Sequence, residues 1–144
     1  LGIASILGRF FFGWLSDRLR DAKYAASGGF LLMVLGMPIL MIADNAATLA
    51  VYALIFGFGY GSLAPMMPIL LADRFGRHVL GTAYGVLTFF VAGIGGSAGP
   101  FLCGQIYDHY GSYDYAWQAA TVILLLSTFL VLALKRRRSP AETV

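Results

Sequence analysis

The chain has 144 residues, of which 59% are hydrophobic and only 12% are charged. Soluble domains carry roughly 25% charged residues, and a domain of this size cannot hide so large an apolar excess in one core. The composition therefore predicts a protein surrounded by lipid and argues against a soluble enzyme.

Four apolar stretches, at residues 25–43, 48–72, 80–104 and 116–134, are long enough to cross a bilayer, which takes about 20 residues as a helix. A fifth, shorter stretch occupies residues 1–15 and begins without a polar lead. Backbone groups in lipid must be hydrogen-bonded within the segment, so we expect all five to be helices. The predicted fold class is an all-α membrane protein, interpreted as a fragment of a longer one.

The Lys and Arg residues indicate the orientation of these helices. Nine of the ten lie in the joints 16–24 and 73–79 or in the tail after residue 134, whereas the joints 44–47 and 105–115 contain none. A zigzag chain places the three cationic segments on one side, and the positive-inside rule makes that side cytoplasmic. We expect a multi-pass protein of the plasma (inner) membrane, with a domain at 1–138 and a cytoplasmic tail at 139–144.

Several other kinds of protein are excluded by the distribution of polar residues. The basic run at 135–138 directly follows a span, so we expect it to anchor that helix at anionic headgroups and expect no nucleic-acid partner. Cys103 is the only cysteine, which excludes a disulfide framework. The four full spans hold no His, Asp or Glu, so we expect no metal site, cofactor or acid–base pair and no enzyme activity.

Arg9 is the tenth cation, and it lies eight residues before Asp17, or about 12 Å along a helix. A charge inside a span is costly unless it faces protein, water or a partner, and it is a functional candidate for that reason. Ser5, Arg9, Gly13 and Ser16 fall on one helix face. Arg9 could bind a carboxylate through its planar fork, pair with an acid on a helix outside the chain, or extend to the membrane surface.

The run at residues 13–18 reads Gly-Trp-Leu-Ser-Asp-Arg. It resembles the loop signature of the major facilitator superfamily, found between the second and third helices of each six-helix half. The resemblance implies that Gly13, Asp17, Arg18 and Arg20 form a motif that stabilises closure of the cytoplasmic gate. Glycine also permits close helix approach, and a carboxylate can cap a helix N-terminus.

A second resemblance covers residues 75–85 and 95–113, which are similar to the end of the monocarboxylate and oxalate/formate-type transporters of that superfamily. Two glycine pairs in this region, Gly81 with Gly85 and Gly95 with Gly99, have the spacing that permits close helix packing. Pro100 removes a backbone donor and predicts a kink. The prolines after residue 61 make the 48–72 helix another candidate for a bend, from which Tyr60 could face a cavity.

The resemblance places the five spans as helices eight to twelve of twelve, in a partial major-facilitator bundle. It implies that Arg9 contacts the substrate carboxylate and that Ser5 stands where the family has an acid, and we expect Ser5 and Tyr60 to line the substrate site with Arg9. The expected function is secondary transport of a small organic anion by alternating access, with the bilayer and the missing N-terminal helices as partners. The alternative is a permease or exporter for a neutral or cationic solute, in which Arg9 is structural.

Overall fold

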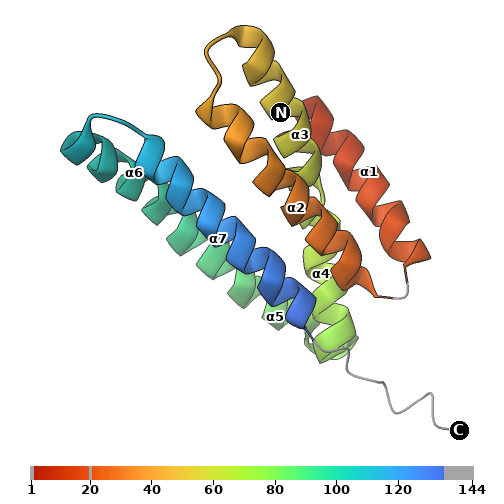
Figure 1. Cartoon of the computed structure of the whole chain (residues 1–144). Helices are drawn as coiled ribbons and strands as arrows, with labels where there is room; N and C mark the ends of the chain where they lie inside the picture. The colour runs from red at the N-terminus through yellow and green to blue at the C-terminus, as the bar shows by residue number, and fades with distance from the viewer. Residues whose placement is uncertain (1, 20, 135–144) are drawn as a thin grey trace, which may run out of the picture.

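The computed structural model describes residues 2–19 and 21–134, and nearly all of this part is helical (Figure 1). Arg20, the basic run at 135–138 and the tail at 139–144 lie outside the described residues. The elements in order are α1 Gly2–Arg18, α2 Ala22–Met41, α3 Ala46–Gly61, α4 Leu63–Phe75, the 3₁₀ turn η1 Arg77–Val79, α5 Leu80–Thr88, the π-helical η2 Phe89–Gly95, α6 Gly96–Tyr110 and α7 Asp114–Ala133. The predicted all-α fold is confirmed.

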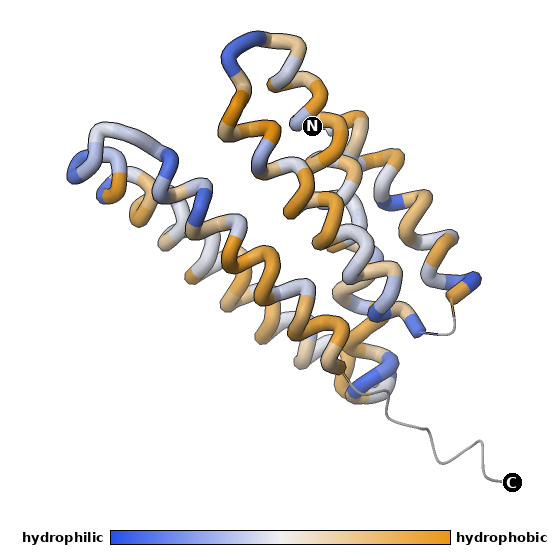
Figure 2. Tube along the Cα trace, in the orientation of Figure 1, coloured by the Kyte–Doolittle hydropathy of each residue, from blue (hydrophilic) through white to orange (hydrophobic). Residues whose placement is uncertain are grey.

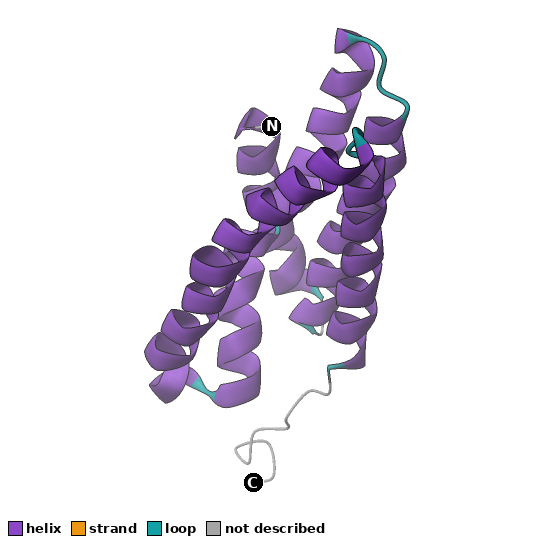
Figure 3. Ribbon diagram, turned by 90° about the vertical axis from the view of Figure 1, so that its left-hand side faces the viewer, coloured by secondary structure: helices purple, strands orange, loops and turns teal. Residues whose placement is uncertain are grey.

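Four helical segments are long and apolar enough to cross a membrane. They are Ala22–Met41, Ala46–Phe75, Arg77–Tyr110 and Asp114–Ala133, which confirms the four full spans expected from hydropathy, and α1 supplies the shorter fifth helix. Hydrophobic residues run along the helices, while hydrophilic ones gather at the two ends of the bundle (Figure 2). A side view shows the longer connections near these ends (Figure 3).

The helix ends follow from local sequence chemistry. Asp21 begins α2 by accepting a hydrogen bond from the Lys23 amide, and Asn45 begins α3 in a reciprocal capping box with Thr48. Such caps satisfy amide groups that have no partner within the helix. Gly76 and Gly111 end α4 and α6 with φ angles of +88° and +66°, a conformation that glycine adopts without steric cost.

The predicted bend in the 48–72 helix corresponds to the interruption at Ser62, between α3 and α4. Pro65 has no amide hydrogen, so it cannot donate to the carbonyl of Gly61 as a regular helix requires. Ser62 is almost completely buried there, at 1% exposure, and lies against Gly29 of α2. The span therefore consists of two helical sections joined where α3 lies closest to its neighbours.

Glycines bring the backbones of α1, α2 and α3 into direct contact. A methyl group added at Gly8 would overlap the carbonyl of Phe58, and one at Gly61 would overlap the carbonyl of Ser5. A methyl group at Gly59 would lie 2.6 Å from the carbonyl oxygen of Gly29. Small residues at such crossings let helices pack without side chains between them, so these positions set the spacing of the three helices.

The described core lies toward the end of the bundle where α1 meets α2. It consists of Phe12 and Met66 against three small residues of α2, with the members Phe12, Ala22, Ala25, Ala26 and Met66. The carboxy-terminal helix α7 packs against α2 on its other side. Helices α1 to α4 and α7 are thereby joined through α2, whereas α5, η2 and α6 contain no buried residue.

We predict that Gly8→Ala destabilises the protein by about 1–3 kcal/mol or more, the usual cost of overpacking, because the carbonyl of Phe58 belongs to a helix and cannot move aside. Gly104→Ala is the matched control, since an added methyl group at Gly104 would meet nothing within 4 Å. The measurement is thermal unfolding of the full-length protein in detergent. Equal midpoints for the two variants would contradict the close crossing.

Candidate functional site

Asp21 and Arg74 form a buried ion pair at the end of the bundle where most basic residues lie. The Arg74 Nη2 atom lies 3.0 Å from Asp21 Oδ1 and 3.2 Å from Oδ2, and each side chain is only 9% exposed. Asp21 belongs to the joint between α1 and α2, and Arg74 to the last turn of α4. The pair therefore fastens two joints that are 53 residues apart in sequence.

Lys23 attaches a third segment to the same end. Its Nζ atom donates to the main-chain carbonyls of Leu132 and Leu134, at 3.3 and 3.2 Å. These carbonyls end α7 and have no donor within the helix, and a cation is favourable at a helix C-terminus. We name this region the cationic end: residues 19, 21–23 and 74–79 with the last turn of α7. The prediction that the cationic segments share one side of the bundle is confirmed for the two joints, while the basic run at 135–138 lies outside the described residues.

The loop motif expected from the sequence lies on the surface, unlike the buried ion pair of Asp21 and Arg74. Asp17 and Arg18 are exposed, and the Arg18 guanidinium lies over the Trp14 ring at 4.7 Å. Gly13 is half-buried, and an added methyl group there would meet nothing within 4 Å. The residue that sequence reasoning missed is Asp21, although its position just before an apolar helix is typical of an N-cap.

Ser5 and Tyr60, which were both predicted to line the substrate site, lie at one cavity. Its volume is about 330 Å³, and it is lined by Gly2, Ser5, Phe56, Gly57 and Tyr60. The Ser5 hydroxyl donates to the Gly2 carbonyl at 2.8 Å, while Tyr60 is 52% exposed. The structure thus brings together a hydroxyl from α1 and a phenol from α3, with glycines leaving room between them.

Arg9 is exposed and does not line that cavity. It follows Ser5 by one helical turn on the same face of α1, toward the cationic end. The main chain of Arg9 lies against Gly61 of α3. A methyl group added at Gly61 would lie only 3.0 Å from the amide nitrogen of Arg9. Within residues 2–19 and 21–134, the one ion pair is that of Arg74 with Asp21, so Arg9 has no acidic partner in this part of the chain.

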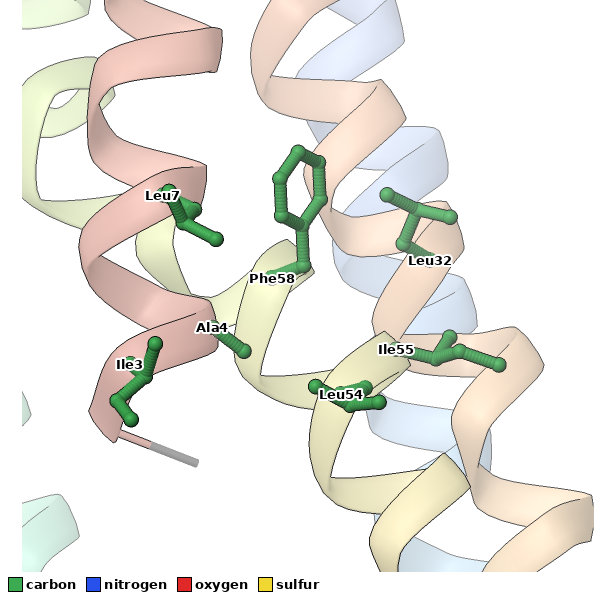
Figure 4. Close-up of a pocket in the computed structure, with 7 residues that line it drawn as sticks. All are labelled: Ile3, Ala4, Leu7, Leu32, Leu54, Ile55 and Phe58. Atoms are coloured by element: carbon green, nitrogen blue, oxygen red, sulfur yellow. The ribbon is translucent and has the colours of Figure 1, made fainter.

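A second cavity, of about 370 Å³, opens on different faces of the same helices. It is lined only by apolar side chains, from Ile3, Ala4, Leu7, Leu32, Leu54, Ile55 and Phe58. Phe58 projects from α3 into the space between α1 and α2 (Figure 4). Burying a charge among such groups is strongly unfavourable, so this cavity cannot hold an anion. Nor do three metal-ligating side chains gather anywhere in the described chain.

The glycines predicted to pack helices closely have open surroundings. An added methyl group at Gly81, Gly85 or Gly99 would meet nothing within 4 Å, and at Gly95 it would meet only the carbonyl of Phe90, 3.6 Å away. Close packing at these positions stays a prediction about helices outside the chain. Pro100 lies inside α6, five residues after the end of the π-helical segment η2, and the kink expected at Pro100 stays a prediction.

The family described as Major Facilitator Superfamily matches residues 1–144. Monocarboxylate transporter 9 of Gallus gallus is 33% identical over 133 residues, which is 92% of this chain and 26% of that protein. The corresponding protein of Pongo abelii is 31% identical over 133 residues, with the same coverage.

Monocarboxylate transporter 12 of Homo sapiens is 28% identical over 137 residues, covering 91% of this chain and 26% of that protein. The chain therefore spans about a quarter of the length of these relatives. No solved structure matches it.

We predict that Asp21→Ala destabilises the protein by about 3–5 kcal/mol, because it leaves the Arg74 charge buried without its partner. The loss of the N-cap contributes about 1 kcal/mol of this. The double variant Asp21→Ala/Arg74→Met should recover most of the stability. Thermal unfolding of the full-length protein measures both, and a double variant no more stable than the single one would contradict a contribution from the unpaired charge.

Proposed function

The chain belongs to the Major Facilitator Superfamily, and from that premise we propose that the full protein transports a small organic monocarboxylate across the membrane by alternating access. In this mechanism two halves rock around a site near the middle of the bilayer. The relatives named as monocarboxylate transporters support this substrate class. The single observation that carries the proposal is Arg9, a cation one turn from a cavity to which Ser5 and Tyr60 each contribute a hydroxyl-bearing side chain.

Arg9 would bind the carboxylate. Helical side chains lean toward the N-terminus of their helix, so the Arg9 side chain extends from its Cα toward Ser5. Residues four apart on a helix are neighbours, with Cβ atoms about 5–6 Å apart. A guanidinium presents two parallel donors to a carboxylate, and the absence of an acidic partner in the described chain leaves these donors available. One cation is matched to a monoanion.

The cavity at Ser5 and Tyr60 would hold the rest of the substrate. Its volume of about 330 Å³ is at the lower end of the range of ligand sites, about 300–1,000 Å³, and supports a small substrate. The exposed Tyr60 phenol is a donor to a second carboxylate oxygen. The Ser5 hydroxyl would have to give up its hydrogen bond to the Gly2 carbonyl in order to donate to the substrate. We therefore propose that Ser5 contributes less to substrate binding than Tyr60.

The cationic end would face the cytoplasm, in keeping with the positive-inside rule, and the membrane would be the plasma (inner) membrane. Asp17, Arg18 and Arg20 would latch this face against the missing N-terminal helices when the cytoplasmic gate closes. The exposure of Asp17 and Arg18 supports contacts with a part of the protein outside this chain. The buried pair of Asp21 and Arg74 would keep the latch residues in place.

The second candidate function is transport of a neutral or cationic solute, with Arg9 in a structural role. The observation in its favour is that Arg9 does not line the Ser5–Tyr60 cavity. In that case Arg9 pairs with an acid on a missing helix, and the substrate meets only hydroxyl and aromatic groups. The two functions differ in what the loss of the guanidinium does to transport.

We predict that Arg9→Gln in the full-length protein reduces uptake of a monocarboxylate such as pyruvate at least about 100-fold, because it removes two parallel hydrogen bonds to a charged group, each worth about 1.5–3 kcal/mol. Arg77→Gln is the matched control, since Arg77 is exposed in the η1 turn. Uptake into proteoliposomes measures both. Unchanged pyruvate uptake in Arg9→Gln would reject the anion site and favour the second candidate.

We predict that Tyr60→Phe raises the KM for pyruvate by about tenfold or more, because a hydrogen bond to a charged group contributes about 1.5–3 kcal/mol. Tyr84→Phe, which removes a phenol from the exposed surface of α5, should leave the KM unchanged. The measurement is the concentration dependence of uptake. Equal KM values for Tyr60→Phe and the parent protein would remove Tyr60 from the site.

A further inference from the structure

The helix from Arg77 to Tyr110 changes its hydrogen-bond pattern in the middle. Residues Phe89–Gly95 form the π-helical segment η2, between α5 and α6. At its end the Gly96 amide donates to the Val91 carbonyl, five residues back, whereas an α-helix uses the carbonyl four residues back. The hydroxyl of Ser97 donates to the Gly93 carbonyl at 2.8 Å. Such π segments are rare and are often found at functional sites.

The two sections on either side of η2 are held by different helices. Section α5 lies beside α4, and the two share a groove lined by Leu71, Phe75, Val79, Thr82, Ala83, Val86, Leu87 and Phe90. The far end of α6 is joined to α7 by aromatic contacts: the Tyr107 and Tyr113 rings stack at 4.6 Å, and those of Tyr110 and Tyr115 also lie 4.6 Å apart. Between these supports, η2 has no buried residue.

The residues of η2 and its neighbours lower the free-energy cost of changing between π-helical and α-helical hydrogen bonds. A methyl group at Gly93 or Gly95 would meet only atoms of the preceding turn, at 3.6 Å or more, so within residues 2–19 and 21–134 no neighbouring helix holds this stretch in one register. Glycine weakens the α-helix relative to alanine, and Pro100 cannot donate to the Gly96 carbonyl. The α-helical pattern is therefore little more stable than the π-helical pattern in this segment.

We propose that η2 is a joint that converts between π and α patterns, and that this conversion turns α6 about its own axis relative to α5. A shift of register by one residue rotates the following helix by about 100° and moves it by about 1.5 Å. The proposal goes beyond the transport function above, because it concerns how one helix changes state and requires no particular substrate. Its consequence is that α6 presents different side chains to its surroundings in the two states.

The face of α6 that the rotation would move carries polar side chains near the carboxy-terminal end of the helix. A cavity of about 250 Å³ is lined there by Leu102, Gln105, Ile106, His109 and Tyr110. Rotation by the angle of one residue would carry Gln105 and His109 away from this cavity's present opening. Helix α6 therefore exposes a polar face in one state and withdraws it in the other.

The test uses the full-length protein in nanodiscs, with spin labels at Cys103 in α6 and at Tyr84→Cys in α5, in a background without cysteines outside this chain. Deleting Gly93 removes the surplus residue of η2 and should produce a continuous α-helix with both flanking sections in place. Gly99→Ala is the control, because an added methyl group there meets nothing within 4 Å. Distances between the labels are measured by pulsed electron spin resonance, with and without pyruvate.

We expect two distance populations in the parent protein and in Gly99→Ala, and one population in the deletion variant. If the deletion variant does not fold, Gly93→Ala replaces it and should shift the ratio of populations toward the α pattern. A single population in the parent protein, or two unchanged populations after the deletion, overturns the joint. Two populations that collapse on deletion but do not respond to pyruvate support the joint and count against the proposed substrate.

Discussion

The contact of backbone with backbone where α3 crosses α1 and α2 is the constraint on which the rest of the bundle depends. Gly8, Gly29, Gly59 and Gly61 leave no space for even a methyl group at these crossings. In lipid there is no hydrophobic force between apolar helices, so close van der Waals packing must hold them together. The resulting spacing also places Ser5 opposite Tyr60, because both lie within four residues of a crossing glycine.

The polar interactions at the cationic end depend on this packing in turn. Asp21 and Arg74 can form a buried pair only because α2 and α4 are held at a fixed distance by the core around Phe12 and Met66. Lys23 then attaches the end of α7 to the same point. One short stretch at the start of α2 thus connects three helices, and the α5–α6 helix remains less constrained.

The helices of the chain differ in how many contacts hold them in place. Helices α1 to α4 and α7 are joined through contacts with α2, while the α5–α6 helix is supported near its two ends and carries the π segment between them. An element that must change its surroundings during transport needs few buried contacts, since each such contact favours one state. The cavity at Ser5 and Tyr60, which we propose holds the substrate, lies on α1 and α3, within the group of helices joined through α2.

Much of the fold could be predicted from the sequence, because lipid makes the requirement on each span a local one. The four full spans, the shared side of the cationic segments and the interruption after Gly61 follow from hydropathy, charge and proline. Of the candidate site, helix periodicity singled out the polar face of α1 that carries Ser5, whereas its meeting with Tyr60 at one cavity came from the structure, and substrate binding by either residue stays a prediction. The role of Arg9 stays a prediction, since no acidic residue of the described chain pairs with it.

The sequence by itself determined where the helices lie and which ends share a side, since apolar length and charge act on each segment separately. Only the tertiary structure decided that Asp21 pairs with Arg74, that Gly8 and Gly61 form a crossing, and that Lys23 caps α7. These choices depend on which faces of distant segments meet. Many glycines and charges are equivalent by local rules, and packing geometry alone distinguishes them.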